Sequence, residues 1–281
     1  MSILRYPGGK TRLLSSIRPF LDPLLTDASE FTDLFVGGGS VLLDVAARYP
    51  NLHLVANDKD PGVVALWAVL AGDRAGCEWL KALVQQALPT LALRDEFKAR
   101  GGAVGDPVTR AFETLVLNRT SFSGNMTGGP LGGRHQRGET RIGSRWRPER
   151  LCNEIDRVHA LLHGRCEVLS EDAADLLGRP VGPRAVIYLD PPYFSVGNDL
   201  YRECMTHEDH ARLAERLRRR QDWVLSYDDA PEVHDLYGWA SIVPVAARYS
   251  VARSRAARQE LLIVPVAHPR CCGLNGLALL P

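Results

Sequence analysis

The sequence lacks several features that mark special classes of protein. No apolar run approaches the roughly 18 residues that a membrane-spanning helix needs, so we expect no association with a membrane. No basic-then-apolar signal segment opens the chain, and its six cysteines form neither a CxxC pair nor a zinc-ligand spacing. We therefore expect free thiols in a reducing compartment, a cytoplasmic location and no bound metal.

The sequence also lacks a phosphate-binding P-loop, although Gly9-Lys10-Thr11 is similar to the end of one. That pattern requires a glycine five residues before Gly9, where this chain has Leu4, and a buried strand that leads into the loop. The segment before Leu4 is too short to form a buried strand. The ligand of Lys10 is therefore not predicted to be a nucleotide phosphate.

A strong excess of either charge is missing as well, because 34 basic residues nearly balance 33 acidic ones. The arginines are nevertheless clustered, and between Asn118 and Arg150 they greatly outnumber the acids Glu139 and Glu149. Basic patches on a neutral protein predict a polyanion bound at one place, and we expect nucleic acid rather than a solvated surface. The clusters are Arg119, Arg134, Arg137, Arg141, Arg145, Arg147 and Arg150, and then Arg248, Arg253, Arg255 and Arg258.

What the sequence does contain is the alternation of strand and helix that is typical of a doubly wound α/β sheet. Residues 31–36 predict a buried strand that stops at three glycines, and a helix follows that Ser40 can cap. Residues 53–58 predict the next strand, and a helix starts at Pro61. Further strands are expected at 166–170, 185–193, 223–229, 239–251 and 259–267, the last two as an antiparallel pair.

This alternation is interrupted in the middle of the chain. Residues 72–117 are predicted to be helical, and residues 120–145 are glycine-rich, polar and basic without the periodicity of a core. A helix from residue 151 then leads back to the strands. We expect a catalytic core of residues 1–70 and 160–281, with residues 71–159 inserted as a mostly helical recognition module.

The most specific short pattern is Asp190-Pro191-Pro192-Tyr193, which ends a predicted strand. Ligands of open α/β sheets bind beyond the carboxyl ends of the strands. The two prolines fix the backbone and leave their carbonyls able to accept hydrogen bonds. Asp190 and the Pro191 carbonyl could hold the amino hydrogens of a planar base, and Tyr193 could stack on its ring. A rigid turn with a capping aspartate is the alternative.

Two further patterns point to the same edge of the sheet. The segment FVGGGS is not a dinucleotide fingerprint, because Leu42 stands where the third glycine would be. Gly37 and Gly39 instead favour close approach of a ligand that is not a phosphate, or simply a tight turn from strand to helix. Asp58, which ends the second strand, could accept the hydroxyls of a ribose or cap the next helix.

Taken in order, these segments resemble the motifs of the DNA adenine methylase family, the N6-adenine methyltransferases. Residues 5–13 (RYPGGKTRL) resemble the N-terminal motif X, and residues 33–44 (DLFVGGGSVLLD) resemble motif I. Residues 55–67 resemble motif II, and residues 185–194 (AVIYLDPPYF) resemble motif IV. Residues 168–177 and 248–264 are similar to motif III and to the C-terminal segment, so the resemblance spans nearly the whole chain and is least in the insert.

The resemblance implies a Rossmann-like core that binds S-adenosyl-L-methionine and methylates adenine N6 in double-stranded DNA. Lys10 would face the carboxylate of the methionine moiety. Asp172 would meet the adenine of the cofactor, and Glu171 is an equally placed rival. The implied cofactor contacts are Tyr6, Lys10, Phe35, Gly37, Gly39, Asp58, Asp172 and Asp190.

The catalytic group implied is Asp190, Pro191, Pro192 and Tyr193, acting on a base that is flipped out of the duplex. DNA contacts are expected from the insert, some of them on phosphates and one or two on guanine edges. Alternatives are cytosine N4 or RNA as the substrate, or an inactive DNA-binding homologue, and a cognate restriction endonuclease is a candidate partner. The expected DNA contacts are Asn118, Arg119, Arg134, Arg137 and Arg141.

Overall fold

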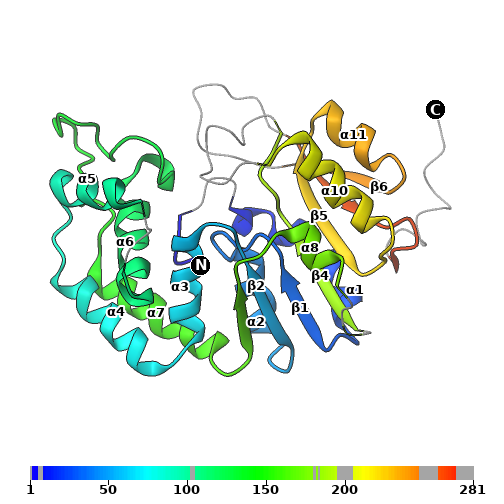
Figure 1. Cartoon of the computed structure of the whole chain (residues 1–281), viewed down its shortest axis with the longest axis horizontal. Helices are drawn as coiled ribbons and strands as arrows, with labels where there is room; N and C mark the ends of the chain where they lie inside the picture. Colours follow the sequence, from blue (N-terminus) through cyan, green and yellow to red (C-terminus); the bar gives the residue numbers. More distant parts are fainter. Residues whose placement is uncertain are drawn as a thin grey trace.

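A seven-stranded sheet of order β3-β2-β1-β4-β5-β7-β6 forms the centre of the molecule (Figure 1). It is seen in a computed structural model that describes residues 2–5, 9–101, 105–179, 182, 184–194, 205–246 and 259–269. The five neighbouring strands β3, β2, β1, β4 and β5 run parallel to one another, and β7 lies antiparallel to both β5 and β6. The strands are β1 (Glu30–Asp33), β2 (His53–Asn57), β3 (Cys166–Leu169), β4 (Ala185–Leu189), β5 (Trp223–Asp228), β6 (Ser241–Ala246) and β7 (Gln259–Val264).

The order of the strands reverses beside β1, because the chain moves outward through β2 and β3 and then returns to place β4 on the other side of β1. This reversal is the switch point at which doubly wound sheets bind their ligands. The predicted Rossmann-like α/β fold is confirmed, and so is the final antiparallel pair.

Helices cover both faces of this sheet, which explains why β4 is apolar throughout. Val186 and Tyr188 pack in one core with α1, α2 and α3. Ile187 and Leu189 pack in a second core with α8, α10 and α11. These helices are α1 (Leu14–Leu25), α2 (Ser40–Arg48), α3 (Pro61–Ala71), α8 (Ala173–Leu177), α10 (His207–Leu217) and α11 (Pro231–Tyr237), with a short 3-10 turn η1 (Lys10–Arg12) before α1.

The elements next to the glycine turn differ in detail from the predictions. Strand β1 ends at Asp33, so the turn begins earlier than residue 36. Ser40 is the first residue of α2 rather than its cap, because Gly39 occupies the cap position in the left-handed conformation. Asp60, and not Asp58, caps α3 by accepting from the backbone of the first helical turn.

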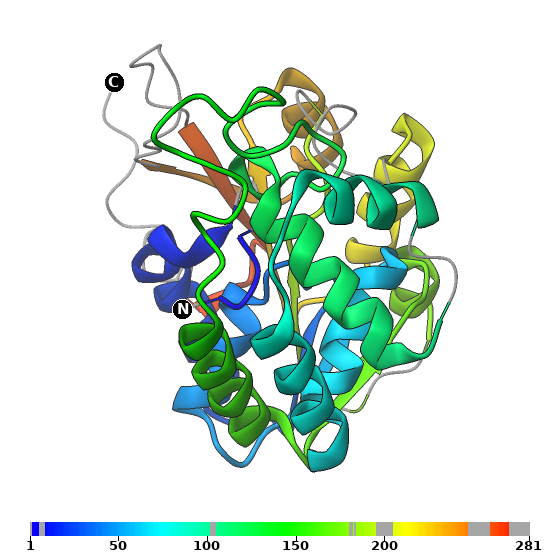
Figure 2. The same ribbon diagram turned by 90° about the vertical axis from the view of Figure 1, so that its left-hand side faces the viewer.

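The helices of the middle region lie beside the sheet rather than on it (Figure 1), and Figure 2 shows the molecule from that side. Helices α4, α6 and α7 contact α3, whereas α5 packs against α6. Helix α6 runs along α3, and α4 packs against α7. A loop follows α6, and in the described structure it holds one isolated bridge, between Ser121 and Pro130. The helices are α4 (Arg74–Gln86), α5 (Leu91–Arg100), α6 (Pro107–Thr120), α7 (Pro148–Leu162) and the 3-10 turn η2 (Phe122–Gly124).

The core of the sheet continues into these helices, since Leu66 of α3 belongs to the same buried cluster as Leu115 of α6 and Ile155 of α7. The boundaries expected for the insert, residues 71–159, stay a prediction. Within the part of the chain that the structure describes, no helix has both the length and the apolar character that crossing a membrane requires. Cys77, Cys152 and Cys166 are free thiols there.

Candidate active site

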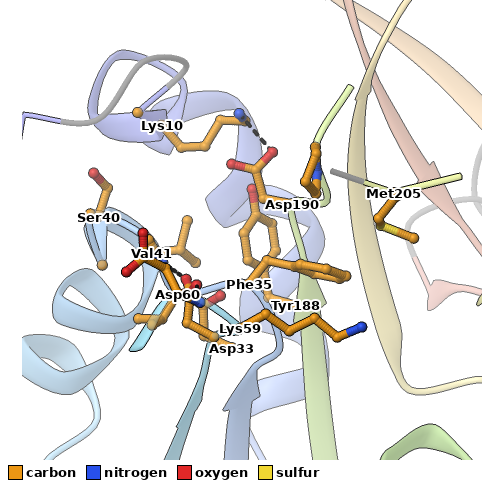
Figure 3. A pocket seen from close by; sticks show the side chains of 17 residues that line it. Lys10, Asp33, Phe35, Ser40, Val41, Lys59, Asp60, Tyr188, Asp190 and Met205 are labelled. Atoms are coloured by element: carbon orange, nitrogen blue, oxygen red, sulfur yellow. Dashed lines mark hydrogen bonds and ion pairs between the residues drawn. The ribbon is translucent and has the colours of Figure 1, made fainter. Parts of the chain in front are cut away.

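A pocket opens at the carboxyl ends of β1, β2 and β4, beside the switch point of the sheet (Figure 3). About 860 Å³ of empty space lies within it, a figure that includes the open solvent at its mouth. Its walls come from η1, the glycine turn, the end of β2 and the end of β4. The lining residues are Gly9, Lys10, Asp33, Phe35, Val36, Gly37, Gly38, Gly39, Ser40, Val41, Asp58, Lys59, Asp60, Tyr188, Asp190, Pro192 and Met205.

The glycine turn that forms one wall is held by α3. Gly37 and Gly39 have φ values of 42° and 65°, in the left-handed region that favours glycine. A Cβ at Gly39 would lie 2.3 Å from the ring of Trp67, and the indole nitrogen of Trp67 donates to the Gly37 carbonyl at 2.9 Å. The turn interpretation of these glycines therefore applies, and the same turn lines the pocket.

Asp58 joins the end of β2 to this turn. One carboxylate oxygen accepts from the Gly37 amide at 2.8 Å, and the other accepts from the Asp60 amide at 2.9 Å. Burial raises the pKa of Asp58 to about 6, although these backbone donors oppose the shift. Asp58 thus presents a fixed, partly buried carboxylate to the pocket, and it does not cap the following helix.

Asp33 is a second carboxylate of the pocket, and the sequence analysis did not single it out. It ends β1, is only 2% exposed, and among the described residues its Oδ1 atom has no hydrogen-bond partner. Burial, followed by the charge of Asp190, raises its pKa to about 8. An acid inside the predicted buried strand of residues 31–36, shortly before the glycine turn, was the available sequence signal.

Asp190 stands at the end of β4, and its two carboxylate oxygens are used differently. The Oδ1 atom lies 2.8 Å from the Nζ of Lys10 and accepts from the Ser226 hydroxyl at 2.9 Å. Ser226, on the neighbouring strand β5, also lies 2.9 Å from the hydroxyl of Tyr188. Within the part of the chain that the structure describes, Oδ2 of Asp190 makes neither an ion pair nor a hydrogen bond. Asp190 therefore has one anchored oxygen and one oxygen that remains available at the pocket, where the side chain is 22% exposed.

Lys10 is buried between two acidic side chains. Its own side chain is 3% exposed, and Nζ lies 3.8 Å from Oε2 of Glu260 on β7 in addition to Asp190. It also lies 4.9 Å from the centre of the Tyr193 ring, within the range of a cation–π contact. The structure thus brings together Lys10, Asp190 and Tyr193 from the predicted set. Glu260 and Ser226, which contact them, were not among the predicted residues.

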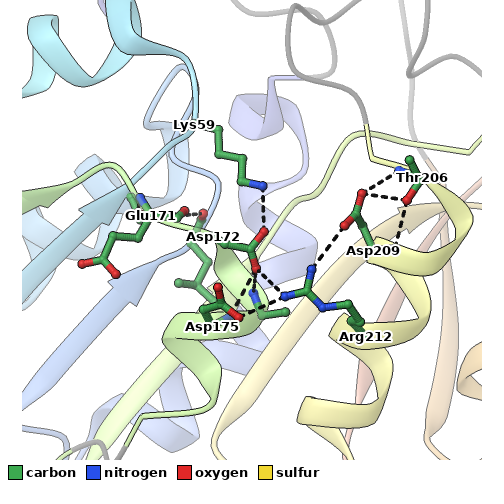
Figure 4. A network of polar contacts seen from close by, with 10 residues as sticks. Lys59, Glu171, Asp172, Asp175, Thr206, Asp209 and Arg212 are labelled. Carbon is green, nitrogen blue, oxygen red and sulfur yellow. Dashed lines mark hydrogen bonds and ion pairs between the residues drawn. The ribbon is translucent and has the colours of Figure 1, made fainter.

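The Asp172 prediction falls on a network beside the pocket rather than in its lining (Figure 4). The Asp172 carboxylate accepts from the backbone at the start of α8 and pairs with Lys59 at 2.7 Å and Arg212 at 3.4 Å. Its rival Glu171 pairs through its side chain with Arg179. Tyr6, the remaining predicted cofactor contact, lies outside the described residues.

The residues expected to bind DNA divide into buried and exposed groups. Asn118 is fully buried, and its amide bonds to the backbone N–H and carbonyl of Arg5 at 2.9 Å each. A direct DNA contact by Asn118 does not fit this structure, because its side chain anchors the N-terminal segment instead. Arg119 is partly buried, donates to the carbonyl of Ile3, and has its pKa lowered to about 10 by burial and by nearby arginines.

Arg134, Arg137 and Arg141 are exposed on the loop of residues 121–147. This loop stands at the end of the molecule toward which the carboxyl ends of the parallel strands point (Figure 1). Arg134 pairs with Asp95 of α5 at 2.8 Å. The second arginine cluster, Arg248 to Arg258, lies outside the described residues.

Comparison with known proteins agrees with this geometry. The chain is 25% identical over 205 residues to the Type II methyltransferase M.MjaIII of Methanocaldococcus jannaschii (strain ATCC 43067 / DSM 2661 / JAL-1 / JCM 10045 / NBRC 100440). The matched segment covers 68% of this chain and 68% of that relative. Residues 6–251 match the family described as D12 class N6 adenine-specific DNA methyltransferase. That match spans most of the chain, and the chain belongs to this family of adenine-specific DNA methyltransferases.

Proposed function

We propose that this DNA methyltransferase transfers the methyl group of S-adenosyl-L-methionine to N6 of an adenine that has been flipped out of double-stranded DNA. The observation that carries the proposal is Asp190, which has Oδ1 anchored by Lys10 and Ser226 while Oδ2 is left at the pocket. An acceptor fixed in this way is suited to hold an amino group beside a methyl donor.

The pocket fits the proposed cofactor in its polar groups. Asp58 keeps lone pairs for ribose hydroxyls, since each of its oxygens accepts a single backbone hydrogen bond among the described residues. Among the described residues the buried Oδ1 of Asp33 has no hydrogen-bond partner, and a polar group of the ligand could supply one. Phe35, Gly37 and Gly39 would line the cofactor, and Lys10 would lie at its methionine end. When bound, the cofactor supplies an electrophilic methyl group on a sulfonium.

Asp172 remains our candidate for the adenine end of the cofactor, through its position at the rim. Its carboxylate already forms ion pairs with Lys59 and Arg212, and Lys59 itself lines the pocket. Contact with the adenine would therefore involve the Lys59–Asp172 pair together rather than Asp172 alone.

The target amine is a poor nucleophile because its lone pair is delocalised into the adenine ring. Asp190 Oδ2 and the Pro191 carbonyl would accept its two hydrogens, localise the lone pair and direct it at the methyl group. A carboxylate is far too weak a base to deprotonate the neutral exocyclic amine before methyl transfer begins. The amine proton therefore leaves late, once the nitrogen has begun to bond to carbon.

Tyr193 is proposed to stack on the flipped adenine, and Pro192 lines the pocket next to it. The Tyr193 ring is only 9% exposed, and the ammonium of Lys10 lies over it. Stacking would therefore require groups that cover the ring to move when the base enters.

The exposed loop arginines, Arg134, Arg137 and Arg141, are proposed to contact DNA, mostly at phosphates. Arg119 is partly buried and bonded to the backbone, which suits a fixed phosphate contact better than reading of a base edge. A cognate restriction endonuclease and a cytoplasmic location remain parts of this proposal.

Expression in a host without DNA methylation tests the function directly. The wild type should leave N6-methyladenine at a recurring site in the genome, whereas Asp190→Ala should leave none while remaining folded. Asp235→Ala, an exposed aspartate on α11, is the matched control and should methylate like the wild type. Near wild-type methylation by folded Asp190→Ala would refute the mechanism, and N4-methylcytosine in place of methyladenine would refute the substrate.

A further inference from the structure

Glu260 is a buried carboxylate that no sequence motif led us to expect in the site. It lies in β7, where the four residues that follow it, Leu261 to Val264, are apolar and buried, and it is itself only 2% exposed. Burial of a carboxylate is strongly unfavourable unless charged or hydrogen-bonding groups compensate it. The partners of Glu260 therefore indicate why an acid occupies this strand.

Two of the partners of Glu260, Tyr193 and Lys10, belong to the site described above. The Tyr193 hydroxyl donates to Oε2 of Glu260 at 2.9 Å, and the Lys10 ammonium lies 3.8 Å from the same oxygen. Lys10 in turn lies 2.8 Å from Asp190. A single ammonium thus stands between two carboxylates, of which Asp190 lines the pocket and Glu260 is buried and hydrogen-bonded to Tyr193.

We propose that Glu260 is a positioning residue for methyl transfer, which fixes the Tyr193 ring through its hydroxyl and draws the Lys10 ammonium partly away from Asp190. The inference rests on the proposed function and adds a residue to it. Because Lys10 interacts with both carboxylates, it neutralises Asp190 less, and Asp190 is a stronger hydrogen-bond acceptor for the amine hydrogens. With Glu260 neutral, Lys10 would lose the attraction of this second carboxylate and interact more strongly with Asp190, and Asp190 would be a weaker acceptor.

The ionisation of Glu260 offers a signature that a purely structural role would lack. Burial raises its pKa to about 7, a shift that Lys10 opposes and Asp190 supports, while Asp228 on β5 adds a smaller repulsion and Tyr193 a hydrogen bond that lowers it. The transfer rate should therefore rise through neutral pH as Glu260 ionises. A glutamine at this position cannot ionise, so its rate should lack this rise.

The test is the single-turnover rate of methyl transfer at saturating S-adenosyl-L-methionine and duplex DNA. Glu260→Gln should lower this rate about tenfold or more at about pH 8 and approach the wild-type rate at about pH 5.5. Its affinity for the cofactor and its melting temperature should stay close to the wild-type values. Glu167→Gln, the same change on the exposed edge strand β3, is the matched control and should leave the rate unchanged.

Tyr193→Phe removes the hydroxyl that Glu260 holds and keeps the ring. Since that hydroxyl acts through Glu260, the double variant Tyr193→Phe/Glu260→Gln should transfer methyl groups no more slowly than Glu260→Gln alone. A wild-type rate for folded Glu260→Gln, or a loss explained entirely by weaker cofactor binding, overturns the inference. If Glu260→Gln does not fold, a wild-type rate for Tyr193→Phe overturns it instead. Absence of transfer by the wild type overturns the proposed function, so the two failures are distinct.

Discussion

The buried carboxyl of Asp33 predicts how the stability of this protein changes with pH. Its pKa is about 8 in the folded chain, raised by burial and by Asp190, against 3.8 for an unperturbed aspartate. Between these values the folded state holds a proton that the unfolded chain has lost. The free energy of unfolding must therefore fall as the pH rises, by about 1.4 kcal/mol per pH unit from this group alone.

The perturbation is Asp33→Asn, which keeps the shape of the side chain and removes its ionisation. Going from about pH 5 to about pH 7, the wild type should lose about 2.7 kcal/mol more stability than Asp33→Asn, since both pH values lie between the two pKa values. Any cost of the amide that does not depend on pH cancels in this difference. The raised pKa values of Asp58 and Glu260 affect both proteins alike.

Urea unfolding at the two pH values measures this difference. Asp27→Asn, in an exposed turn, is the matched control and should run parallel to the wild type. If the curves of the wild type and Asp33→Asn keep the same separation at both pH values, Asp33 does not hold a proton in the folded state, and the electrostatic description of the pocket is wrong.

Three further substitutions test other parts of the structure. Gly39→Ala should lower the free energy of unfolding by about 2 kcal/mol or more, because the backbone there is left-handed and the added Cβ would lie 2.3 Å from the Trp67 ring. The control Gly129→Ala, whose added Cβ meets nothing within 4 Å, should lower it much less in the same urea titration. Lys10→Ala should weaken cofactor binding, measured by calorimetry, about tenfold or more and DNA binding less, and equal weakening of both would argue against its place at the cofactor. Arg137→Glu should weaken DNA binding and reduce the slope of log K against log salt by about 0.9 for each phosphate that the side chain no longer neutralises, and an unchanged slope would remove Arg137 from the interface.

Local sequence determined the elements near the site well. The apolar run before Gly37, the glycines themselves and the acid that follows the next strand were enough to predict strand, turn, helix and strand in order, because each signal acts over a few residues. Helix α1 was not anticipated. It contains Pro19 and Pro23, which normally interrupt a helix, and its buried face of Ile17, Phe20 and Leu21 holds it against the sheet.

The predicted DNA contact of Asn118 did not fit the structure, because this side chain, like helix α1, is placed by contacts with distant parts of the chain. Its position before a basic, glycine-rich loop suggested an exposed polar contact, but it bonds to the backbone of Arg5, 113 positions earlier in the chain. No pattern within a short window indicates that the N-terminal segment passes over α6. Burial of a polar side chain depends on which distant backbone groups are left to satisfy it.

The sequence by itself determined the class of sheet and the order of its strands and helices near the glycine turn, because these depend on local periodicity and on turn residues at the ends of strands. The expectation that Lys10, Asp190 and Tyr193 share one site came from the resemblance of their segments to family motifs, and the structure brings the three side chains close together. Only the tertiary structure decided which groups surround them. Tyr193 and Glu260 stand 67 positions apart, and they meet because β5 alone separates β4 from β7 in the sheet. Strand order places Ser226 beside Asp190 in the same way. Charge, burial and hydrogen bonding at the site are therefore set by the packing of neighbouring strands, which no single segment encodes.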